Sequence, residues 1–165
     1  MQVLYIVFNV LIAIAATAIM EFVAWFTHKY IMHGVLWVLH KDHHVPHKGH
    51  VEKNDLFVLF FATPAVLCLV FGIGYLVWPL ISTGIGITLY GVGYTLFHDI
   101  MFHKRIKWLR IPAKWAYVRR IVNAHRNHHK SIDKTPGEAF GFLWVSRRYE
   151  SAPKKSIGTK GGIGD

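Results

Sequence analysis

The sequence predicts an all-α integral membrane protein, a bundle of about three transmembrane helices plus cytoplasmic or interfacial helices that carry a histidine-rich two-metal site. Three observations support this fold class. Of the 165 residues, 53% are hydrophobic and 17% are charged, which is too apolar for an ordinary soluble domain. Uncharged runs cover residues 3–20 and 56–97, and the second run has the length of two spans of about 20 residues each. All twelve histidines lie in or beside two blocks that follow these runs.

Three spans follow from the apolar runs, at residues 3–25, 56–78 and 80–97. Trp78 and Pro79, followed by residues 82–86, are where we expect the tight reversal between the last two spans. Proline and glycine interrupt helices, and tryptophan favours the membrane interface. The first span lacks the basic start of a secretory signal, so we expect it to be retained.

Lysine and arginine gather on one side of these spans, which predicts the orientation. That side should be cytoplasmic, because basic residues are enriched there. We therefore expect a multi-pass protein of the bacterial inner (cytoplasmic) membrane with its active site on the cytoplasmic side. The net charge of +10 indicates contact with anionic lipid headgroups, and no nucleic-acid-binding module is recognisable. The basic residues on this side are Lys29, Lys41, Lys48, Lys53, Lys104, Arg105, Lys107, Arg110, Lys114, Arg119 and Arg120.

The chain length indicates one domain, residues 1–150, followed by a flexible C-terminal tail, residues 151–165, that is rich in Gly and Lys. Cys68 is the only cysteine and lies within an apolar span, which favours a packing role. Four glycines also lie within a span and indicate helix packing rather than a phosphate-binding loop. They are Gly84, Gly86, Gly91 and Gly93.

A further helix is predicted after the third span, with Pro112 in its first turn. Trp115, Val118 and Val122 recur there at three- and four-residue spacing, while basic residues occupy other faces. This pattern fits an amphipathic helix on the membrane surface. It fits equally a soluble-side helix that packs on the histidine blocks, and either position would bring His125 to the cytoplasmic face.

The two histidine blocks repeat one order, an HxxxxH box followed by an HxxHH box. Ten histidines make up the boxes: His28, His33, His40, His43, His44, His98, His103, His125, His128 and His129. Imidazoles crowded together would depress one another's protonation, so we expect them to be metal ligands. His47 and His50 lie outside the boxes, where a ligand and a polar side chain at the interface are equally compatible with the sequence.

Helical geometry suggests how the boxes are used. Residues at i, i+3 and i+4 share a face, so His40, His43 and His44 can converge on one point. Residues at i and i+5 are about 140° apart on a regular helix. Either the helix is locally widened at His28 and His33, as in a π-bulge, or the two histidines bind different metals. Ten ligands in all suit two metals.

Neutral imidazoles are suitable ligands for Fe, Zn, Cu and Ni, so the histidines indicate one of these metals. Metal-bound imidazoles usually donate their second N–H to a carboxylate or carbonyl. Six residues are candidates for this supporting role: Glu21, Asp42, Asn54, Asp55, Asp99 and Asn123. The aromatic residues near the boxes could line a substrate channel, although an interface belt is the stronger expectation. They are Trp25, Phe26, Tyr30, Trp37, Tyr94 and Phe97.

The sequence around the boxes resembles the bacterial beta-carotene 3-hydroxylases, short members of the fatty acid hydroxylase and sterol desaturase superfamily of membrane di-iron oxygenases. The resemblance rests on HKYIMHG, HxxHHxPxKG followed by ExNDL, HDxxxH, and AHRxHH followed by FGFL, and covers residues 21–144. The boxes alone are shared across the superfamily, and their surroundings indicate the hydroxylase. His50 and Val51 depart from the pattern before the Glu of ExNDL without touching the boxes.

The resemblance implies two iron ions, O₂ as oxidant, a ferredoxin-type electron donor with its reductase, and a carotenoid taken from the bilayer. The implied reaction converts beta-carotene through beta-cryptoxanthin to zeaxanthin by hydroxylation at C3 and C3′. A carotenoid ketolase, or a lipid desaturase or hydroxylase of the same superfamily, is the nearer alternative. A membrane metal-binding or metal-transport protein is a non-enzyme alternative, but a transporter would need more polar residues within the spans.

Overall fold

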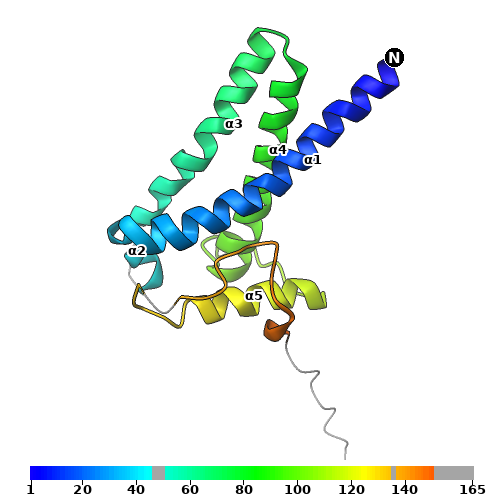
Figure 1. Cartoon of the computed structure of the whole chain (residues 1–165). Helices are drawn as coiled ribbons and strands as arrows, with labels where there is room; N and C mark the ends of the chain where they lie inside the picture. Colours follow the sequence, from blue (N-terminus) through cyan, green and yellow to red (C-terminus); the bar gives the residue numbers. More distant parts are fainter. Residues whose placement is uncertain (46–50, 135–136, 151–165) are drawn as a thin grey trace, which may run out of the picture.

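The computed structural model describes residues 1–45, 51–134 and 137–150. This part of the chain contains helices and no strand, so the predicted all-α class is confirmed. Three long helices rise from a broader base of short helices and loops, and the first of them runs obliquely across the third (Figure 1). His47, His50 and the predicted tail, residues 151–165, lie outside the described residues.

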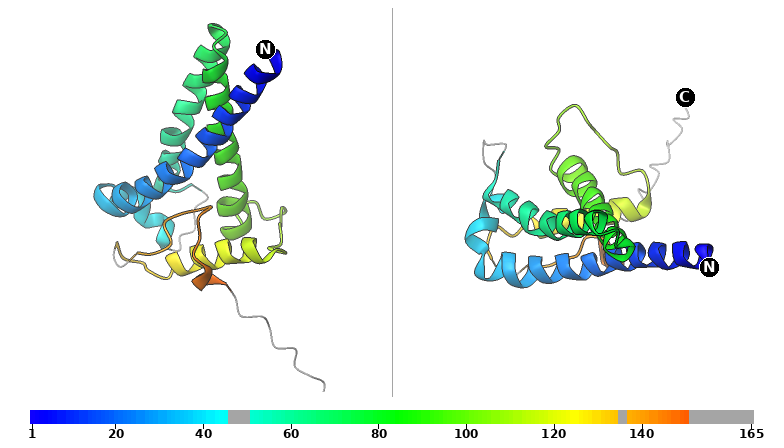
Figure 2. Two further views of the ribbon diagram at one scale, coloured as in Figure 1. Left: turned by 45° about the vertical axis from the view of Figure 1, so that its right-hand side comes forward. Right: turned by 90° about the horizontal axis from the view of Figure 1, so that it is seen from above.

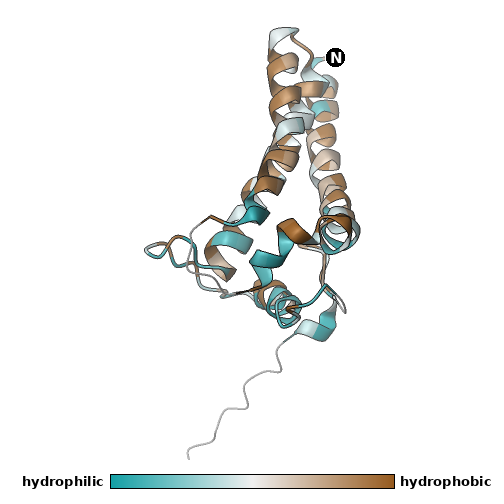
Figure 3. Ribbon diagram, turned by 90° about the vertical axis from the view of Figure 1, so that its left-hand side faces the viewer, coloured by the Kyte–Doolittle hydropathy of each residue, from teal (hydrophilic) through white to brown (hydrophobic). Residues whose placement is uncertain are grey.

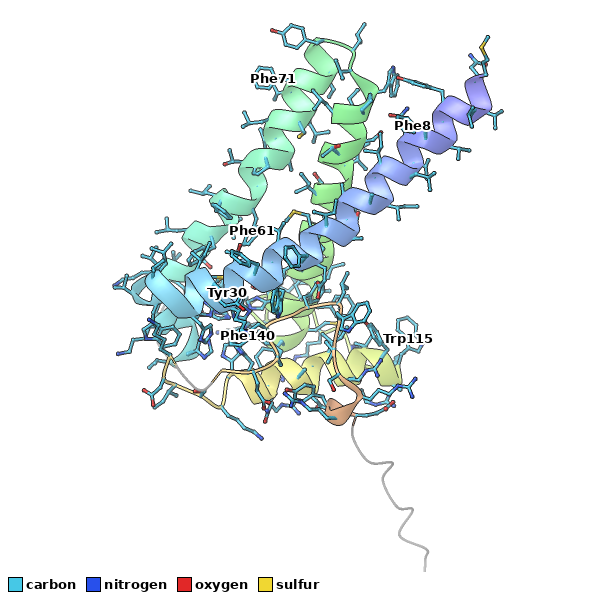
Figure 4. All side chains as sticks on the ribbon, in the orientation of Figure 1. Phe8, Tyr30, Phe61, Phe71, Trp115 and Phe140 are labelled. Carbon is cyan, nitrogen blue, oxygen red and sulfur yellow. The ribbon has the colours of Figure 1, made fainter. Side chains whose placement is uncertain are left out.

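The three long helices are α1 (Gln2–Phe26), α3 (Leu56–Gly74) and α4 (Trp78–Tyr94). With the short helices that extend them, they form three segments long and apolar enough to cross a membrane, Gln2–Val35, Lys53–Gly74 and Trp78–Phe102. Apolar residues cover these helices, and polar residues gather at the base (Figure 3). Their outward side chains are exposed in the isolated chain, including Phe8 and Phe71 (Figure 4). An apolar surface of this kind suits lipid rather than water.

The reversal between α3 and α4 lies earlier than predicted. The chain turns at residues 75–77, where Leu76 has a positive φ of 55°, and Trp78 and Pro79 already belong to the first turn of α4. Proline is well tolerated there because the first backbone N–H groups of a helix have no partner within it. Residues 82–86 are therefore helical, and the predicted turn at these positions is wrong.

Two glycines of α4 let its neighbours approach closely. A side chain at Gly86 would meet the carbonyl oxygen of Ala13 on α1, and one at Gly84 would meet Leu69 on α3. Thr17 on α1 donates a hydrogen bond to the carbonyl of Gly86, 3.0 Å away. Gly91, by contrast, has open space beside it. The packing role predicted for the glycines thus holds for Gly84 and Gly86 but not for Gly91.

Below the bundle, the chain forms two π-helices, η1 (Thr27–Val35) and η3 (Thr95–Phe102), and two α-helices, α2 (Trp37–His44) and α5 (Ala116–His128). The short 3₁₀ helices η2 (Lys53–Asp55) and η4 (Arg147–Tyr149) complete the base. Helix α5 crosses beneath the three long helices, and the segment that follows it returns along their lower ends (Figure 2).

Helix α5 begins later than predicted, because Pro112 precedes it and Trp115 is its N-cap. Trp115 is 75% exposed and points away from the base (Figure 4), so it does not belong to the packed face. The packed face contains Val118, Ile121 and Ala124, all of which are buried. Of the two positions expected for this helix, the structure shows packing against the histidine blocks.

Candidate metal centre

The ten box histidines form two groups of five in which one nitrogen of each side chain approaches the others. Within each group these nitrogens all lie within 4.8 Å of one another. The first group contains His28, His33, His40, His44 and His128. The second group contains His43, His98, His103, His125 and His129. The two groups adjoin, since the rings of His44 and His129 stack with their centroids 4.6 Å apart.

The division of the HxxHH boxes differs from the expected convergence on one point. His40 and His44 enter the first group, but His43 enters the second. Adjacent helix positions point about 100° apart, so the ring of His43 meets His98 and His103, whereas the ring of His44 meets His33 and His128. His128 and His129 at the end of α5 diverge in the same way. Each HxxHH helix therefore serves both groups.

The HxxxxH boxes lie on π-helices, which was one of the two expected solutions. In a π-helix the backbone bond joins residues five apart, so the side chains of residues i and i+5 return to nearly the same face. His28 and His33 on η1 accordingly share the first group, and His98 and His103 share the second. The alternative, in which the histidines of one box bind different metals, is not what the structure shows.

In the first group, the Nδ1 atoms face groups that accept hydrogen bonds. The Nδ1 atoms of His28, His33, His44 and His128 donate to backbone carbonyls at 3.0, 3.1, 2.9 and 2.8 Å. A carbonyl can only accept, so Nδ1 carries the proton and Nε2 of the neutral ring is left with a lone pair. The accepting carbonyls belong to Phe140, Lys134, Ser131 and Glu138, in the order of these histidines.

In the second group, carboxylates accept hydrogen bonds from two of the Nδ1 atoms. His43 donates to Glu52 at 2.7 Å and His98 donates to Asp99 at 2.9 Å. Arg105 lies 3.2 Å from the Glu52 carboxylate and 2.8 Å from Asp55. Burial opposes ionisation of Glu52, but the His43 and Arg105 contacts prevail and lower its pKa to about 2.

The Nε2 lone pairs converge, and this arrangement fits a metal ion. Within the first group, Nε2 of His40 lies 3.2 Å from that of His28 and 3.1 Å from that of His44. Lone pairs so close repel one another unless a cation lies between them. Two nitrogens that bind one metal at about 2.1 Å and at right angles lie about 3.0 Å apart.

The second group has the same geometry, with Nε2 separations of 2.9 Å for His43 and His98 and 3.3 Å for His103 and His125. Nε2 of His129 is buried and has no hydrogen-bond partner among the residues that the structure describes. In the first group, burial lowers the pKa of His44 to about 4 and that of His128 to about 3. Both rings are therefore neutral at pH 7, the form that binds metals.

Comparison with known protein families matches residues 13–146 to the family described as fatty acid hydroxylase. The chain belongs to the fatty acid hydroxylase family. This family member is 42% identical over 139 residues to the beta-carotene hydroxylase of Pseudescherichia vulneris, a match that covers 84% of this chain and 78% of that protein. It is 41% identical over 139 residues to the beta-carotene hydroxylase of Pantoea ananas, with the same coverage of both chains.

A plant relative is longer than the chain described here. The chloroplastic beta-carotene 3-hydroxylase of Gentiana lutea is 36% identical over 142 residues, which cover 84% of this chain and 43% of the plant protein. No solved structure matches the chain.

Two of the six predicted supporting residues contact a box histidine. Asn54 accepts from Nδ1 of His40 at 2.7 Å, and Asp99 accepts from His98. Glu52 was not among the predicted residues. A signal for it was present, because Glu52 belongs to the ExNDL motif together with Asn54.

For the other four predicted supporting residues, the described contacts are with groups other than box histidines. Asp55 binds Arg105 and the backbone N–H of Glu52. Asp42 accepts from the backbone of Lys53, Asn123 donates to the carbonyl of Tyr149, and Glu21 binds a distant segment of backbone described below. These contacts do not include a box histidine, so a supporting role at the metal centre stays a prediction for these four residues.

An apolar pocket of this protein adjoins both histidine groups. Its polar wall consists of His28, from the first group, and His98 and His125, from the second. The remaining wall is Tyr94, Phe97, Phe102, Ile121, Val122, Phe140, Gly141 and Phe142. Tyr94 and Phe97 thus line a pocket, where an interface belt was the stronger expectation, while Phe26 and Tyr30 are exposed as a belt requires.

Proposed function

We propose that this protein is a beta-carotene 3-hydroxylase that inserts one oxygen atom at C3 and then at C3′ of the two beta-ionone rings, at a non-haem di-iron centre. The observation that carries the proposal is the pair of five-histidine groups with converging lone pairs beside an apolar pocket. The identity of 42% to a bacterial beta-carotene hydroxylase supports the substrate.

The histidines suit oxidation chemistry. Imidazole ligands resist an oxidant strong enough to cleave an unactivated C–H bond, whereas thiolate ligands would be oxidised. The ten box residues are all histidines, so this set includes no thiolate. Two bound iron ions would supply O₂ activation, so that one oxygen atom enters the C–H bond and the other leaves as water with two electrons and two protons from outside. The chain's own residues hold the irons through Nε2 and fix each ring through its Nδ1 partner.

Substrate access follows from the position of the pocket. A carotene has no polar group and is effectively insoluble in water, so it has to arrive sideways from the lipid. The pocket lies where α4 continues into η3, at the end of a membrane-spanning segment. A ring of a polyene within the bilayer can therefore reach the histidines without crossing water.

The proposed electron donor is a ferredoxin-type protein with its reductase. Such carriers are acidic, and the exposed residues Lys104, Lys107, Arg110, Lys114 and Arg119 near the base provide a basic docking face. This face would lie on the cytoplasmic side of the bacterial inner membrane.

Expression in a bacterium that accumulates beta-carotene, followed by chromatography of the pigments, tests the activity. We expect beta-cryptoxanthin to appear first and to fall as zeaxanthin rises, because only one ring can lie at the metals at a time. Products with a keto group or a new double bond would instead assign the ketolase or desaturase activity. Zeaxanthin formed without any free intermediate, even with excess carotene, would contradict release between the two steps.

Two variants test the metal centre, one for each group. We expect His128→Ala and His43→Ala each to abolish hydroxylation and to lower the iron content of the purified protein. Asp133→Asn is the control. Asp133 is exposed, so this variant should leave both the hydroxylation activity and the iron content unchanged. Full activity of His128→Ala would overturn the two-metal proposal. His47→Ala should be milder than either variant.

A further inference from the structure

Glu21 holds a distant backbone segment through one carboxylate. Its Oε1 accepts hydrogen bonds from three successive backbone N–H groups, those of Phe142, Leu143 and Trp144, at 2.9, 2.8 and 2.9 Å. Its Oε2 accepts from the hydroxyl of Tyr90 on α4 at 2.9 Å. Successive N–H groups aimed at one oxygen form an anion-binding site, and this one ties α1 and α4 to residues 142–144.

The segment held by Glu21, residues 140–144, also contacts the metal centre. The carbonyl of Phe140 accepts from Nδ1 of His28, and the ring of Phe140 lies 5.4 Å from that of His28 and 5.3 Å from that of His128. Phe140 is seen between the lower end of α1 and α5 (Figure 4). The position of this segment therefore affects how a ligand of the first group is oriented.

The same segment forms one wall of the apolar pocket. The ring of Phe142 packs against Tyr90, Tyr94 and Phe97 with centroids 5.9, 5.7 and 5.4 Å apart. The opposite walls belong to η3 and α5. The pocket has a volume of about 30 Å³, room for one or two waters, so a hydrocarbon ring fits there only if aromatic side chains turn aside.

We propose that Glu21 is a positioning residue that fixes residues 140–144 as the wall of a pocket for the cyclic hydrocarbon end of the substrate. The choice of substrate rests on the proposed function. The wall has to stay fixed while its side chains move, because its distance from the histidines sets which ring carbon faces the metals. Backbone N–H groups at membrane depth otherwise lack partners, so loss of the carboxylate releases this wall.

Hydrogen exchange of the purified protein in detergent, read by mass spectrometry for residues 137–146, tests the anchor without any activity. In Glu21→Ala these amides should exchange about tenfold faster or more, the factor expected when a hydrogen bond to a charged group is lost. Glu21→Gln should be intermediate, since the amide oxygen still accepts but carries no charge. Unchanged protection in both variants would overturn the proposal.

Asn9→Ala is the matched control. Asn9 is a buried polar residue of the same helix and accepts a hydrogen bond from Ser82 on α4 at 3.1 Å, but its contacts lie far from residues 140–144 in the bundle. It should loosen the pairing of α1 with α4 and leave exchange at residues 137–146 unchanged. Equal acceleration in Asn9→Ala would show a general effect of loosening the bundle and would overturn the specific role.

Product analysis tests the pocket. Glu21→Gln should retain its iron, raise KM for beta-carotene several-fold more than it lowers kcat, and yield some product hydroxylated at ring carbons next to C3. Iron lost in proportion to activity would assign Glu21 to the metal centre and overturn the pocket role. If the wild-type protein forms no hydroxylated carotenoid, the proposed function fails, while the exchange experiment still decides whether Glu21 anchors the wall.

Discussion

At the scale of single residues, the two histidine groups differ in what orients their rings. In the first group, the Nδ1 atoms donate to four backbone carbonyls and to Asn54. In the second group, two Nδ1 atoms donate to the carboxylates of Glu52 and Asp99. A carboxylate makes an imidazole a stronger electron donor than a carbonyl does. The two metals would therefore not be equivalent.

Glu52→Gln tests this difference. Glutamine still accepts from His43 but removes the charge, so the second group should bind metal about 10- to 100-fold more weakly, while the first is unaffected. In metal titration of the apo protein in detergent, one of the two binding steps should then weaken by this factor while the other keeps its wild-type affinity. Asp133→Asn serves as the charge-matched control. Equal weakening of both sites would contradict separate support of the two groups.

The neutral histidines predict a pH dependence of the metal-free protein. The unfolded pKa of His44 is 6.5 and the folded value is about 4, so between these values the unfolded chain binds more protons. Stability therefore falls as the pH drops from 6.5 towards 4. Thermal unfolding of the chelator-treated protein in detergent should show its midpoint decreasing over this range. His44→Gln should have a shallower dependence, and a midpoint independent of pH would contradict the neutral, buried state.

At the scale of elements, the π-helices solve a spacing problem that a regular helix cannot. They place residues five apart on one side, and they directly continue α1 and α4, so the HxxxxH histidines lie at the ends of these two spans. Helix packing above them is equally specific. Gly86 on α4 lets the backbone of α1 approach so closely that no side chain fits between them.

Gly86→Ala tests this contact. A methyl group there would lie 2.4 Å from the carbonyl oxygen of Ala13, so the two helices have to shift, at a cost of about 1 to 3 kcal/mol. We expect a lower thermal midpoint in detergent. Gly91→Ala is the matched control, because its added methyl group meets no atom within 4 Å. Equal midpoints for both variants would contradict close packing of α1 against α4.

At the scale of the whole molecule, three spans place the α3–α4 turn on one side of the membrane and the histidine base on the other. Helix α5 is not a fourth span in this structure, since it crosses beneath the bundle (Figure 1). Its residues Arg119, Arg120 and Arg126 explain this, because each arginine costs about 2.5 to 3.5 kcal/mol at mid-bilayer.

Cysteine labelling tests the orientation. In a Cys68→Ser background, Tyr75→Cys at the exposed turn should react with a membrane-impermeant thiol reagent in intact cells. Lys107→Cys, also exposed, should react only after the cells are opened, because the positive-inside rule places it in the cytoplasm. The reverse pattern would refute the cytoplasmic location of the histidine base.

The sequence by itself determined the spans, the ten histidines and the duplicated order of the boxes. These are local properties: apolar length, residue type and spacing act along the chain, so they can be seen without a fold. The supporting residues Asn54 and Asp99 could also be predicted, because both lie close in sequence to the boxes.

Only the tertiary structure decided how the histidines divide into groups and what Glu21 does. His43 and His44 are neighbours in sequence, yet they face different groups, because histidines from distant elements meet them, His98 for His43 and His128 for His44. Glu21 binds backbone N–H groups more than 120 residues away, and the carbonyls that orient four imidazoles are backbone groups of the loops that follow α5. Backbone groups have the same chemistry at every residue, so their partners are set by the path of the chain and not by its composition.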